Sequence, residues 1–587
     1  MLNARSAAVA ALLAIAAACG SDSTTTDPGT KPPPTASVAS VDVTPQTAEV
    51  VVGRTAKLTA TPRDAAGSAL NGRTVSWSSS NANVASVDNS GTVTAVAVGN
   101  ATITASSEGK TATAAITVKA DAPAVSVASV SIAAAPDTIE AWDATALRAS
   151  TRDAKDSLLT GRVIRWTTSN PAVAIIDSVT GVLTGIDRGT ITVTATSEGK
   201  LGTQSHVIVI KYRSISAGTM HACDLASGGI AWCWGLNGAE GRIGSDQLSS
   251  TSMSSTPVKV PGNLRFTQLA TFGRHTCGLT SEGKAYCWGY NGWGGLGTSA
   301  NISQSFTPVA VAGNLTFRSI AAGSDHTCAV TLDYVAYCWG NNDWRQLGTG
   351  TSAMSSTPVA VTGGASFVSI AAGAGFTCGV AQLNGVAYCW GANSIGQTGD
   401  GKQINYGNVF VSTPQQVVGG LSFKSLSLGN QYACGVTTAG QAYCWGSNST
   451  KLGAGTGAND SSSPLAVVGG YTFRSVSAGA LHACGVTTSD AVYCWGRNGN
   501  GELGVAPANG SSASAVPVRA GGNFTASEVS AAGTGTGSSG HSCAISVDRL
   551  TAYCFGRNDV GQLGNGTTTS ASVANATPVI IVGQKPL

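Results

Sequence analysis

The second part of the chain repeats one short phrase seven times between Tyr212 and Leu587. Its clearest copy runs from His275 to Gly289 and reads HTCGLTSEGKAYCWG. Successive copies lie about fifty residues apart, the spacing of one small supersecondary unit copied along a chain. Such a unit is too small to bury a core of its own, so neighbouring units must stack. The repeat therefore predicts an array of stacked units over two thirds of the protein.

Each repeat contains four segments with the alternation and residue types of β-strands. In the third copy these segments are 317–322, 326–330, 335–340 and 357–361. Four strands in each of seven units are the pattern of a β-propeller. Composition agrees, because 75 glycines and only 11% charged residues suit short strands joined by turns. The sequence leaves open whether the ring is closed by the strand at Tyr212 or by residues 577–582.

Three phrases of these units carry a family resemblance. They are AAGSDH at 321–326, YCWG at 337–340 and NDVGQLG at 558–564. They resemble regulator-of-chromosome-condensation repeats, and the resemblance extends over residues 212–587. It implies a seven-bladed propeller. The eukaryotic founder of that family is a guanine-nucleotide exchange factor for a nuclear GTPase, but a shared blade implies the fold and not that activity.

Two copies of a different repeat, at 37–120 and 124–211, precede the propeller. Trp77 in TVSWSSSN recurs as Trp166 in VIRWTTSN. Short alternating strands around a tryptophan predict a β-sandwich with that tryptophan buried. The copies resemble the group 2 bacterial immunoglobulin-like family, which implies a stalk or an adhesive module of a surface protein. The matching motifs are WSSSN (77–81), VASVD (84–88), GTVTA (91–95) and GNATITA (99–105). The predicted class is all-β, a seven-bladed β-propeller preceded by two immunoglobulin-like β-sandwiches.

The amino terminus reads as a lipoprotein signal peptide over residues 1–18. It has a basic start at Arg5 and an apolar run too short to span a bilayer, which ends in a lipobox-like AAAC. We expect Cys19 to carry a lipid and 19–36 to be a flexible Ser/Thr/Pro linker. The alternative is an ordinary signal peptide with an incidental cysteine. The expected location is extracytoplasmic, lipid-anchored to a bacterial cell envelope at the outer membrane.

Fifteen cysteines are present, namely Cys19 and two in every repeat. An even set in an exported chain predicts a disulfide framework. In a hairpin with Glu282 at its centre, Cys277 faces Cys287 within disulfide reach. The predicted pairs are Cys223–Cys233, Cys277–Cys287, Cys328–Cys338, Cys378–Cys389, Cys434–Cys444, Cys484–Cys494 and Cys543–Cys554.

A zinc site is the competing hypothesis, because His275 stands two residues before Cys277. Tetrahedral zinc requires four ligands, and the histidine is replaced by Phe376 in repeat four and by Tyr432 in repeat five. We therefore interpret the repeat histidines as packing and hydrogen-bonding residues, and we predict no metal and no cofactor. These histidines are His221, His275, His326, His482 and His541.

The chain offers few signs of catalysis. It shows no nucleophile elbow, metal-binding motif or carboxylate pair. We therefore predict a protein that is not an enzyme and has no catalytic residues; a polysaccharide or antibiotic lyase is the alternative, since some bacterial propellers are lyases. The net charge of +3 is spread without a basic run, which argues against nucleic-acid binding.

The loops that follow each Trp-Gly differ in length and carry aromatic residues. These are Tyr290, Trp293, Phe306, Trp344, Tyr406 and Phe410. Exposed aromatics on loops held by a rigid scaffold are typical of binding hot spots. Trp293 and Trp344 occupy nearly the same place in successive repeats, so we expect them side by side on one face. The alternative is that some of these rings pack between blades.

Together these features predict a monomeric, surface-anchored binding protein for a protein or a glycan, attached to the membrane only through Cys19. The second hypothesis is an exported inhibitor of an extracytoplasmic hydrolase. A secreted bacterial propeller of this kind inhibits β-lactamase through aromatic-rich loops on one face. A single contiguous aromatic patch would favour the inhibitor.

Overall fold

The computed structural model describes residues 36–121, 125–245, 252–402, 404–506, 512–533, 540–570 and 573–582. The predicted signal peptide, Cys19 and nearly all of the predicted linker lie outside these residues. Regular structure in the described ranges consists of β-strands and two short 3₁₀ turns, η1 (Ser227–Gly229) and η2 (Gly238–Glu240). Over the same ranges, no helix has the length and apolar character that a membrane crossing needs. The predicted all-β class is confirmed.

The first sandwich lies in a compact unit that ends at Val125. It contains a four-stranded sheet of order β2-β9-β8-β5, a three-stranded sheet of order β3-β7-β6 and the pair β1-β4. Along β8, Ala101, Ile103 and Ala105 are buried and alternate with more exposed residues, as expected for a sheet with one face on the core. Trp77 is only partly buried against this core. The strands are β1 (Ser40–Thr44), β2 (Thr47–Val51), β3 (Thr55–Lys57), β4 (Thr59–Arg63), β5 (Ser76–Ser79), β6 (Ala85–Val87), β7 (Thr92–Ala95), β8 (Gly99–Ser107) and β9 (Lys110–Lys119).

The second sandwich repeats this plan, with sheets of order β11-β19-β18-β15, β12-β17-β16 and β10-β13-β14. Trp166 is buried in its core at 4% exposure. The prediction of a buried tryptophan therefore holds for this copy and only in part for the first. The strands are β10 (Ser129–Ile132), β11 (Thr138–Glu140), β12 (Ala144–Ala146), β13 (Ala149–Arg152), β14 (Leu158–Leu159), β15 (Arg165–Thr168), β16 (Ala174–Ile176), β17 (Val182–Gly185), β18 (Gly189–Ser197) and β19 (Lys200–Val209).

From Tyr212 onward, the described residues form seven four-stranded antiparallel sheets, each built from consecutive strands. We number these sheets blades 1 to 7 in chain order. Blade 1 comprises β20 (Tyr212–Ala217), β21 (His221–Ala226), β22 (Ile230–Leu236) and β23 (Met253–Lys259). Blade 2 comprises β24 (Phe266–Thr271), β25 (His275–Thr280), β26 (Ala285–Tyr290) and β27 (Gln304–Ala310). Blade 3 comprises β28 (Phe317–Ala322), β29 (His326–Thr331), β30 (Ala336–Gly340) and β31 (Ser355–Ala360).

The other four blades follow the same order of strands. Blade 4 comprises β32 (Phe367–Ala372), β33 (Phe376–Ala381), β34 (Ala387–Ala392) and β35 (Phe410–Gln416). Blade 5 comprises β36 (Phe423–Leu428), β37 (Tyr432–Thr437), β38 (Ala442–Gly446) and β39 (Ser461–Ala466). Blade 6 comprises β40 (Phe473–Ala478), β41 (His482–Thr487), β42 (Val492–Arg497) and β43 (Ala513–Arg519). Blade 7 comprises β44 (Glu528–Ala532), β45 (His541–Ile545), β46 (Ala552–Gly556) and β47 (Val579–Ile580).

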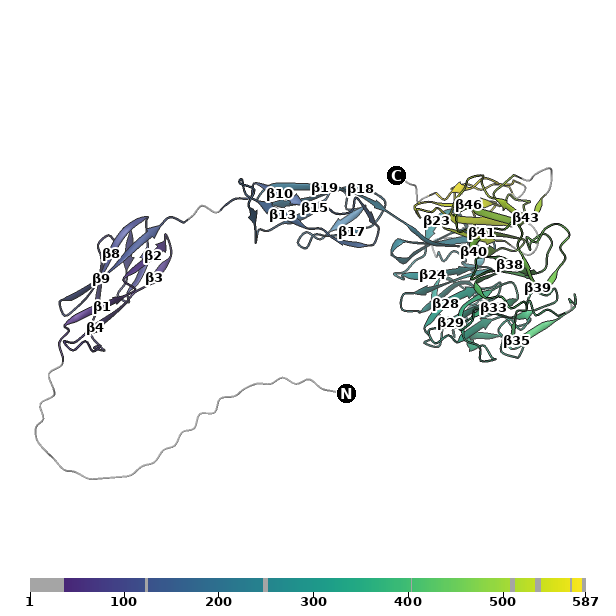
Figure 1. The fold of residues 1–587 in the computed structure, drawn as a ribbon, viewed down its shortest axis with the longest axis horizontal. Helices are drawn as coiled ribbons and strands as arrows, with labels where there is room; N and C mark the ends of the chain where they lie inside the picture. The colour runs from purple at the N-terminus through teal and green to yellow at the C-terminus, as the bar shows by residue number, and fades with distance from the viewer. Residues whose placement is uncertain are drawn as a thin grey trace, which may run out of the picture. The chain divides into compact units, whose positions relative to one another are not determined.

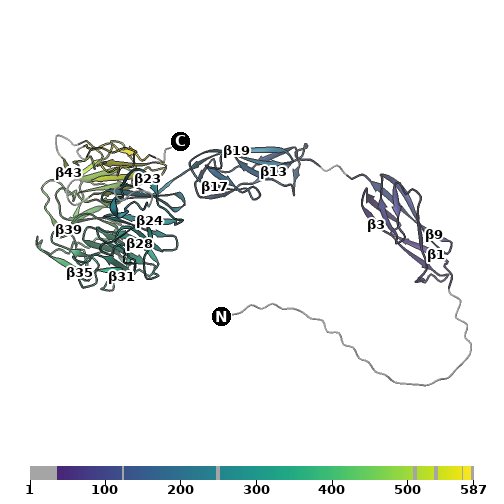
Figure 2. The same cartoon turned by 180° about the vertical axis from the view of Figure 1, so that it is seen from behind.

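The ring closes by packing of blade 1 against blade 7. β47 pairs with β46, so the C-terminal segment completes its own blade, and β20 is the first strand of blade 1. Across the junction, the Ile215 N–H donates to Glu528 Oε1 at 3.2 Å and the Trp234 indole N–H donates to the Gln562 carbonyl at 3.0 Å. Figures 1 and 2 both show the teal start of the propeller beside its yellow end. Neither of the two terminal strands crosses into the other blade.

Every blade has the predicted disulfide. Cys277 faces Cys287 in the register between β25 and β26, and the extra residue in blade 4 falls in the turn, so that Cys378 still faces Cys389. All seven predicted pairs are bonded, with Cα–Cα distances of 4.0 to 4.1 Å. The cysteines are fully buried, so the bonds belong to the core between blades.

The antiparallel order gives the propeller two distinct edges. We call one edge the loop face; it carries the turns between the first and second strands and the long loops between the third and fourth strands. The other edge, the hairpin face, carries the turns between the second and third strands. The second sandwich contacts the hairpin face of blade 1, where Trp142 packs on Gly228 and Glu140 forms an ion pair with Lys211 at 2.8 Å. These contacts leave the loop face uncovered by this sandwich.

Candidate functional site

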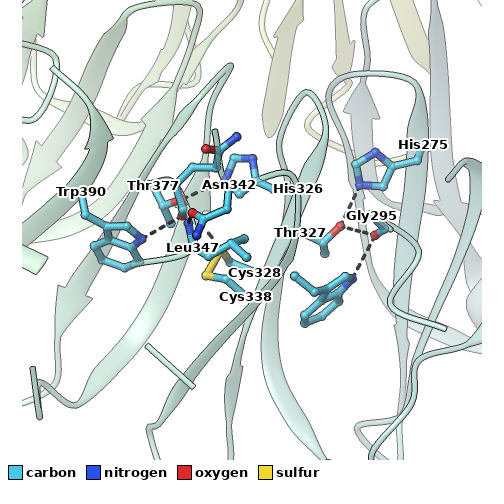
Figure 3. The surroundings of a disulfide bond; sticks show 12 residues. His275, Gly295, His326, Thr327, Cys328, Cys338, Asn342, Leu347, Thr377 and Trp390 are labelled. Atoms are coloured by element: carbon cyan, nitrogen blue, oxygen red, sulfur yellow. Dashed lines mark hydrogen bonds between the residues drawn. A yellow bond between two sulfur atoms is a disulfide. The ribbon is translucent and has the colours of Figure 1, made fainter. Parts of the chain in front are cut away.

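An asparagine at the start of each long loop fixes the shape of the loop face. In blade 3, Asn342 Oδ1 accepts a hydrogen bond from the Leu347 N–H at 3.0 Å, and its amide donates to two loop carbonyls at 2.9 Å (Figure 3). An asparagine makes the corresponding Oδ1 bond in every blade. The seven residues are Asn237, Asn291, Asn342, Asn393, Asn448, Asn498 and Asn558. The loops are therefore held by internal hydrogen bonds, as a rigid binding surface requires.

Four of the five repeat histidines form a hydrogen bond to the next blade. Thr377 Oγ1 donates to the Gln346 carbonyl at 2.9 Å, and His326 Nε2 lies 2.9 Å from the same hydroxyl (Figure 3). Because the single hydroxyl proton goes to the carbonyl, the imidazole must be the donor at Nε2. The Trp390 indole N–H donates to the same carbonyl at 2.9 Å. Burial disfavours the charged ring and lowers the pKa of His326 to about 3.

The same contact joins three other pairs of successive blades. The pairs are His221 with Thr276 at 3.0 Å, His275 with Thr327 at 2.8 Å and His482 with Ser542 at 2.8 Å. Where Phe376 and Tyr432 replace the histidine, the next blade has Ala433 and Ala483 in place of the hydroxyl residue. In the described ranges, no three His, Cys, Asp or Glu side chains are grouped to hold a metal ion. Four of the five repeat histidines thus hydrogen-bond to the next blade. The fifth, His541, is buried, and neither of its ring nitrogens has a hydrogen-bond partner in the described part of the chain.

Two of the six predicted aromatic residues pack on other residues of the propeller and are not exposed on the loop face. The Arg274 guanidinium lies 4.1 Å above the centre of the Tyr290 ring, and Phe306 packs against the Gly241 backbone. Both rings are partly buried. Phe306 thus packs between blades 1 and 2, whereas Tyr290 packs on a residue of its own blade.

The other four predicted aromatic residues are exposed. The exposed fractions are 36% for Trp293, 45% for Trp344, 74% for Tyr406 and 38% for Phe410. Trp344 and Phe410 line one cavity together, and Trp293 is not part of its lining. Both tryptophans belong to long loops of the loop face, and their side-by-side placement stays a prediction.

The cavity has a volume of about 130 Å³ and lies on the loop face where blades 3, 4 and 5 meet. Trp344 comes from the loop of blade 3, and Phe410 begins the last strand of blade 4. Gly375, in the first turn of blade 4, also lines the cavity. A Cβ atom on Gly375 would lie 1.9 Å from Cε3 of Trp344, so the indole lies directly on this backbone. Its exposed ring is therefore held in one position.

Besides Gln397, four neutral polar side chains line the same cavity: Ser394, Asn408, Asn430 and Gln431. None of them makes a side-chain hydrogen bond within the described part of the chain. By contrast, the Gln397 side chain accepts the Ile395 N–H at 2.8 Å. The described lining includes no charged side chain. The cavity thus combines three aromatic rings, those of Trp344, Phe376 and Phe410, with four amide or hydroxyl groups that make no hydrogen bond within the described part of the chain.

Tyr406 stands beside this cavity, one residue before Gly407 of the lining. Its hydroxyl donates to Asp460 Oδ2 at 3.2 Å, which ties the long loop of blade 4 to blade 5. The hydrogen bond to this carboxylate raises the pKa of Tyr406. Tyr406 therefore supports the loop that carries Asn408 and Phe410.

The central channel has a different character. Its cavity of about 200 Å³ is lined by the first strands of all seven blades, mainly by Ala, Ser, Leu and Ile. The described lining contains no titratable side chain. The channel has seven similar walls, whereas the cavity at blades 3 to 5 is lined by residues that differ from one blade to the next.

Sequence reasoning missed Gly375 and the polar lining of the cavity. A signal was present, because Gly375 stands where blades 2 and 3 have Arg274 and Asp325, directly before Phe376 in place of histidine. A comparison of the repeats at this position would have marked blade 4 as different. Asn430 and Gln431 belong to the next blade, and a single repeat gives no sign of their part in the cavity.

Comparison with known proteins places the propeller in a family. The RCC1-like domain matches residues 185–539. The chain belongs to the RCC1-like domain family. The group 2 bacterial Ig-like domain matches residues 37–118. Both resemblances stated from the sequence are therefore confirmed for this propeller and for its first sandwich.

Among curated proteins, the chain is similar to the human E3 ubiquitin-protein ligase HERC2, with 27% identity over 41% of this chain and 5% of the ligase. It is also similar to the ultraviolet-B receptor UVR8 of Arabidopsis thaliana, with 29% identity over 40% of this chain and 52% of the receptor. The chain thus matches about half of the receptor and a small part of the ligase.

Two solved structures resemble it at low identity. Yeast RCC1 (Prp20) bound to Kap60 is 20% identical, with a TM-score of 0.48, over 64% of this chain and 88% of that one. Human WBSCR16 is 18% identical, with a TM-score of 0.49, over 58% of this chain and 90% of that one.

Proposed function

We propose that this protein is an extracytoplasmic binding protein that recognises a protein or glycan partner through the loop face of its propeller. The observation that supports this most directly is the cavity lined by Trp344 and Phe410, in which Trp344 rests on Gly375 and four polar side chains make no hydrogen bond within the described part of the chain. Fixed aromatic side chains in a partly enclosed site are typical binding anchors. In this proposal the immunoglobulin-like domains separate the propeller from the envelope.

The test compares two exposed residues on opposite edges of blade 3. Trp344→Ala should weaken retention of the partner from envelope extract by about 2 kcal/mol, because it removes an anchor. Leu332→Ala is the control, since Leu332 is 58% exposed in the hairpin-face turn of the same blade. Equal retention by both variants and the unmodified chain would refute recognition through the loop face.

The exported hydrolase inhibitor has weaker support. That hypothesis predicts one contiguous aromatic patch, whereas Tyr290 and Phe306 are packed and Trp293 lies outside the cavity of Trp344. The proposed role is therefore binding without catalysis, and it includes neither ubiquitin transfer nor nucleotide exchange. A shared propeller transmits a fold and not an activity.

Lipid attachment at Cys19 completes the proposal, on the evidence of the apolar run before it. Cys19→Ala should lose the acyl mass and release the protein from the membrane fraction. Intact-mass measurement together with fractionation checks both effects. Unchanged fractionation of the variant would exclude a lipid anchor at this residue.

A further inference from the structure

The cavity on the loop face has the chemistry of a sugar subsite. We propose that it binds one neutral pyranose unit of a glycan, with the sugar ring stacked on Trp344. This inference rests on the proposed function and names the ligand class of the same site. It follows from three properties of the lining: a fixed indole, neutral groups that both donate and accept hydrogen bonds, and the absence of charge among the described lining residues.

The indole supplies the stacking surface. A pyranose has one face made of C–H groups, and that face packs well on a flat aromatic ring with its negative quadrupole. Trp344 is 45% exposed, and its other side lies on the Gly375 backbone. Little conformational entropy is therefore lost when a ligand stacks on it. Phe410 closes a second side of the cavity.

The polar lining suits hydroxyl groups. Each sugar hydroxyl both donates and accepts hydrogen bonds, and an amide side chain offers an N–H donor and a carbonyl acceptor together. Asn408, Asn430 and Gln431 provide three such amides, and Ser394 provides a hydroxyl. Because none of them has a side-chain partner in the described part of the chain, a ligand would not compete with existing bonds.

The charge of the lining and the size of the cavity restrict the class of sugar further. A sialic acid, uronic acid or amino sugar would place a charge in a cavity whose described lining has no opposite charge, at a desolvation cost. The small volume of about 130 Å³ suits a single ring-sized group of a ligand. The observations therefore favour a terminal neutral pyranose over a charged sugar.

The experiment uses the full-length protein and saturation-transfer NMR. The probes are methyl glycosides of glucose, galactose, mannose, xylose, N-acetylglucosamine and N-acetylgalactosamine, with methyl glucuronide and glucosamine as charged comparators. We expect at least one neutral glycoside to bind, with its strongest saturation on the C–H face. The charged comparators should bind at least about tenfold more weakly.

Two variants test the site, and a third is the matched control. Trp344→Ala removes the stacking surface, and Gly375→Ala displaces it while keeping the indole; both should weaken the neutral glycoside by about tenfold or more. Trp293→Ala removes an exposed tryptophan from the equivalent loop of blade 2 and should change nothing. Melting temperatures close to that of the unmodified chain would show that the variants are folded.

The outcomes separate this inference from the proposed function. If no neutral glycoside binds, or if Trp344→Ala and Gly375→Ala bind it as the unmodified chain does, the sugar subsite is wrong. If partner retention still depends on Trp344 in that case, the loop face recognises a protein and the proposed function stands. If no neutral glycoside binds and partner retention does not depend on Trp344, both the sugar subsite and the proposed function are wrong.

Discussion

The junction between blades 3 and 4 and the junction between blades 4 and 5 are packed with different residues at the same positions. Between blades 3 and 4, His326 donates to Thr377, whose hydroxyl donates to the Gln346 carbonyl. Between blades 4 and 5, Phe376 takes the place of the histidine and Ala433 that of the threonine. The Trp445 indole N–H still donates to the loop carbonyl of Gln397 at 3.1 Å. One residue pair therefore changes while the rest of the junction is kept.

At these two junctions the histidine and its hydroxyl partner are replaced together, whereas at the closing junction His541 is kept although blade 1 has Ala222 in place of the hydroxyl residue. A lone histidine donor costs free energy without its hydroxyl acceptor, and at the first two junctions both members are present or both absent. The apolar junction is also the one beside the proposed sugar site, where Phe376 lines the cavity. The replacement of the repeat histidine by Phe376 in blade 4 thus coincides with the position of the proposed sugar site.

The largest expected effect tests what the two junctions share. Removing the disulfide of blade 3 (Cys328→Ala with Cys338→Ala) or that of blade 4 (Cys378→Ala with Cys389→Ala) should each lower the free energy of unfolding by about 3 kcal/mol. The two losses should be equal, because the closed loops differ by one residue, at sequence separations of 10 and 11. Guanidinium unfolding under non-reducing conditions measures both. Clearly unequal losses would show that the junctions differ by more than the histidine pair.

Much of this architecture could be predicted from the sequence, because the governing rules are local. The period of two along each strand fixes which cysteines face each other, and the same arithmetic holds in all seven blades. Exposure of the aromatic rings could not be predicted in this way. Tyr290 is covered by Arg274 from the first turn of its blade, and Trp344 rests on Gly375 of the next blade. Such contacts join positions that a repeat pattern does not pair.

A second prediction compares the closing junction with an interior one. At the interior junction, the Gln268 amide donates to the Ile320 carbonyl at 3.0 Å and accepts from its N–H at 3.3 Å. At the closing junction, Glu528 accepts from the Ile215 N–H. Burial of the carboxyl raises the pKa of Glu528 to about 7, against smaller lowering effects from Ile215 and Arg549. A protonated Glu528 can therefore act as a donor in the way that Gln268 does.

The sign of the pH dependence follows from this raised pKa. The folded state keeps the Glu528 proton from about pH 4.5 to about pH 7, where the unfolded state has lost it, so stability falls as the pH rises through this window. Glu528→Gln should remove that fall and be more stable by about 2 kcal/mol at pH 8, with allowance for solvent near the group. At pH 4 the two proteins should be equal. A difference that does not change with pH would contradict a titrating Glu528.

The smallest expected effect is the coupling within the histidine pair itself. His326→Phe together with Thr377→Ala gives the junction of blades 3 and 4 the residue pair of blades 4 and 5. Thr377→Ala alone leaves the His326 N–H without an acceptor, whereas the double variant has no such donor. The double variant should therefore lose about 1 kcal/mol less free energy of unfolding than the sum of the losses in the two single variants.

A titration with acid gives a second test of the same pair. The pKa of His326 is about 3 in the folded state, so protonation of the unfolded state lowers the stability below about pH 6.5. Variants without His326 should lose less stability between pH 6.5 and pH 4. Additive costs and an unchanged acid response would mean that the two residues do not act as a unit.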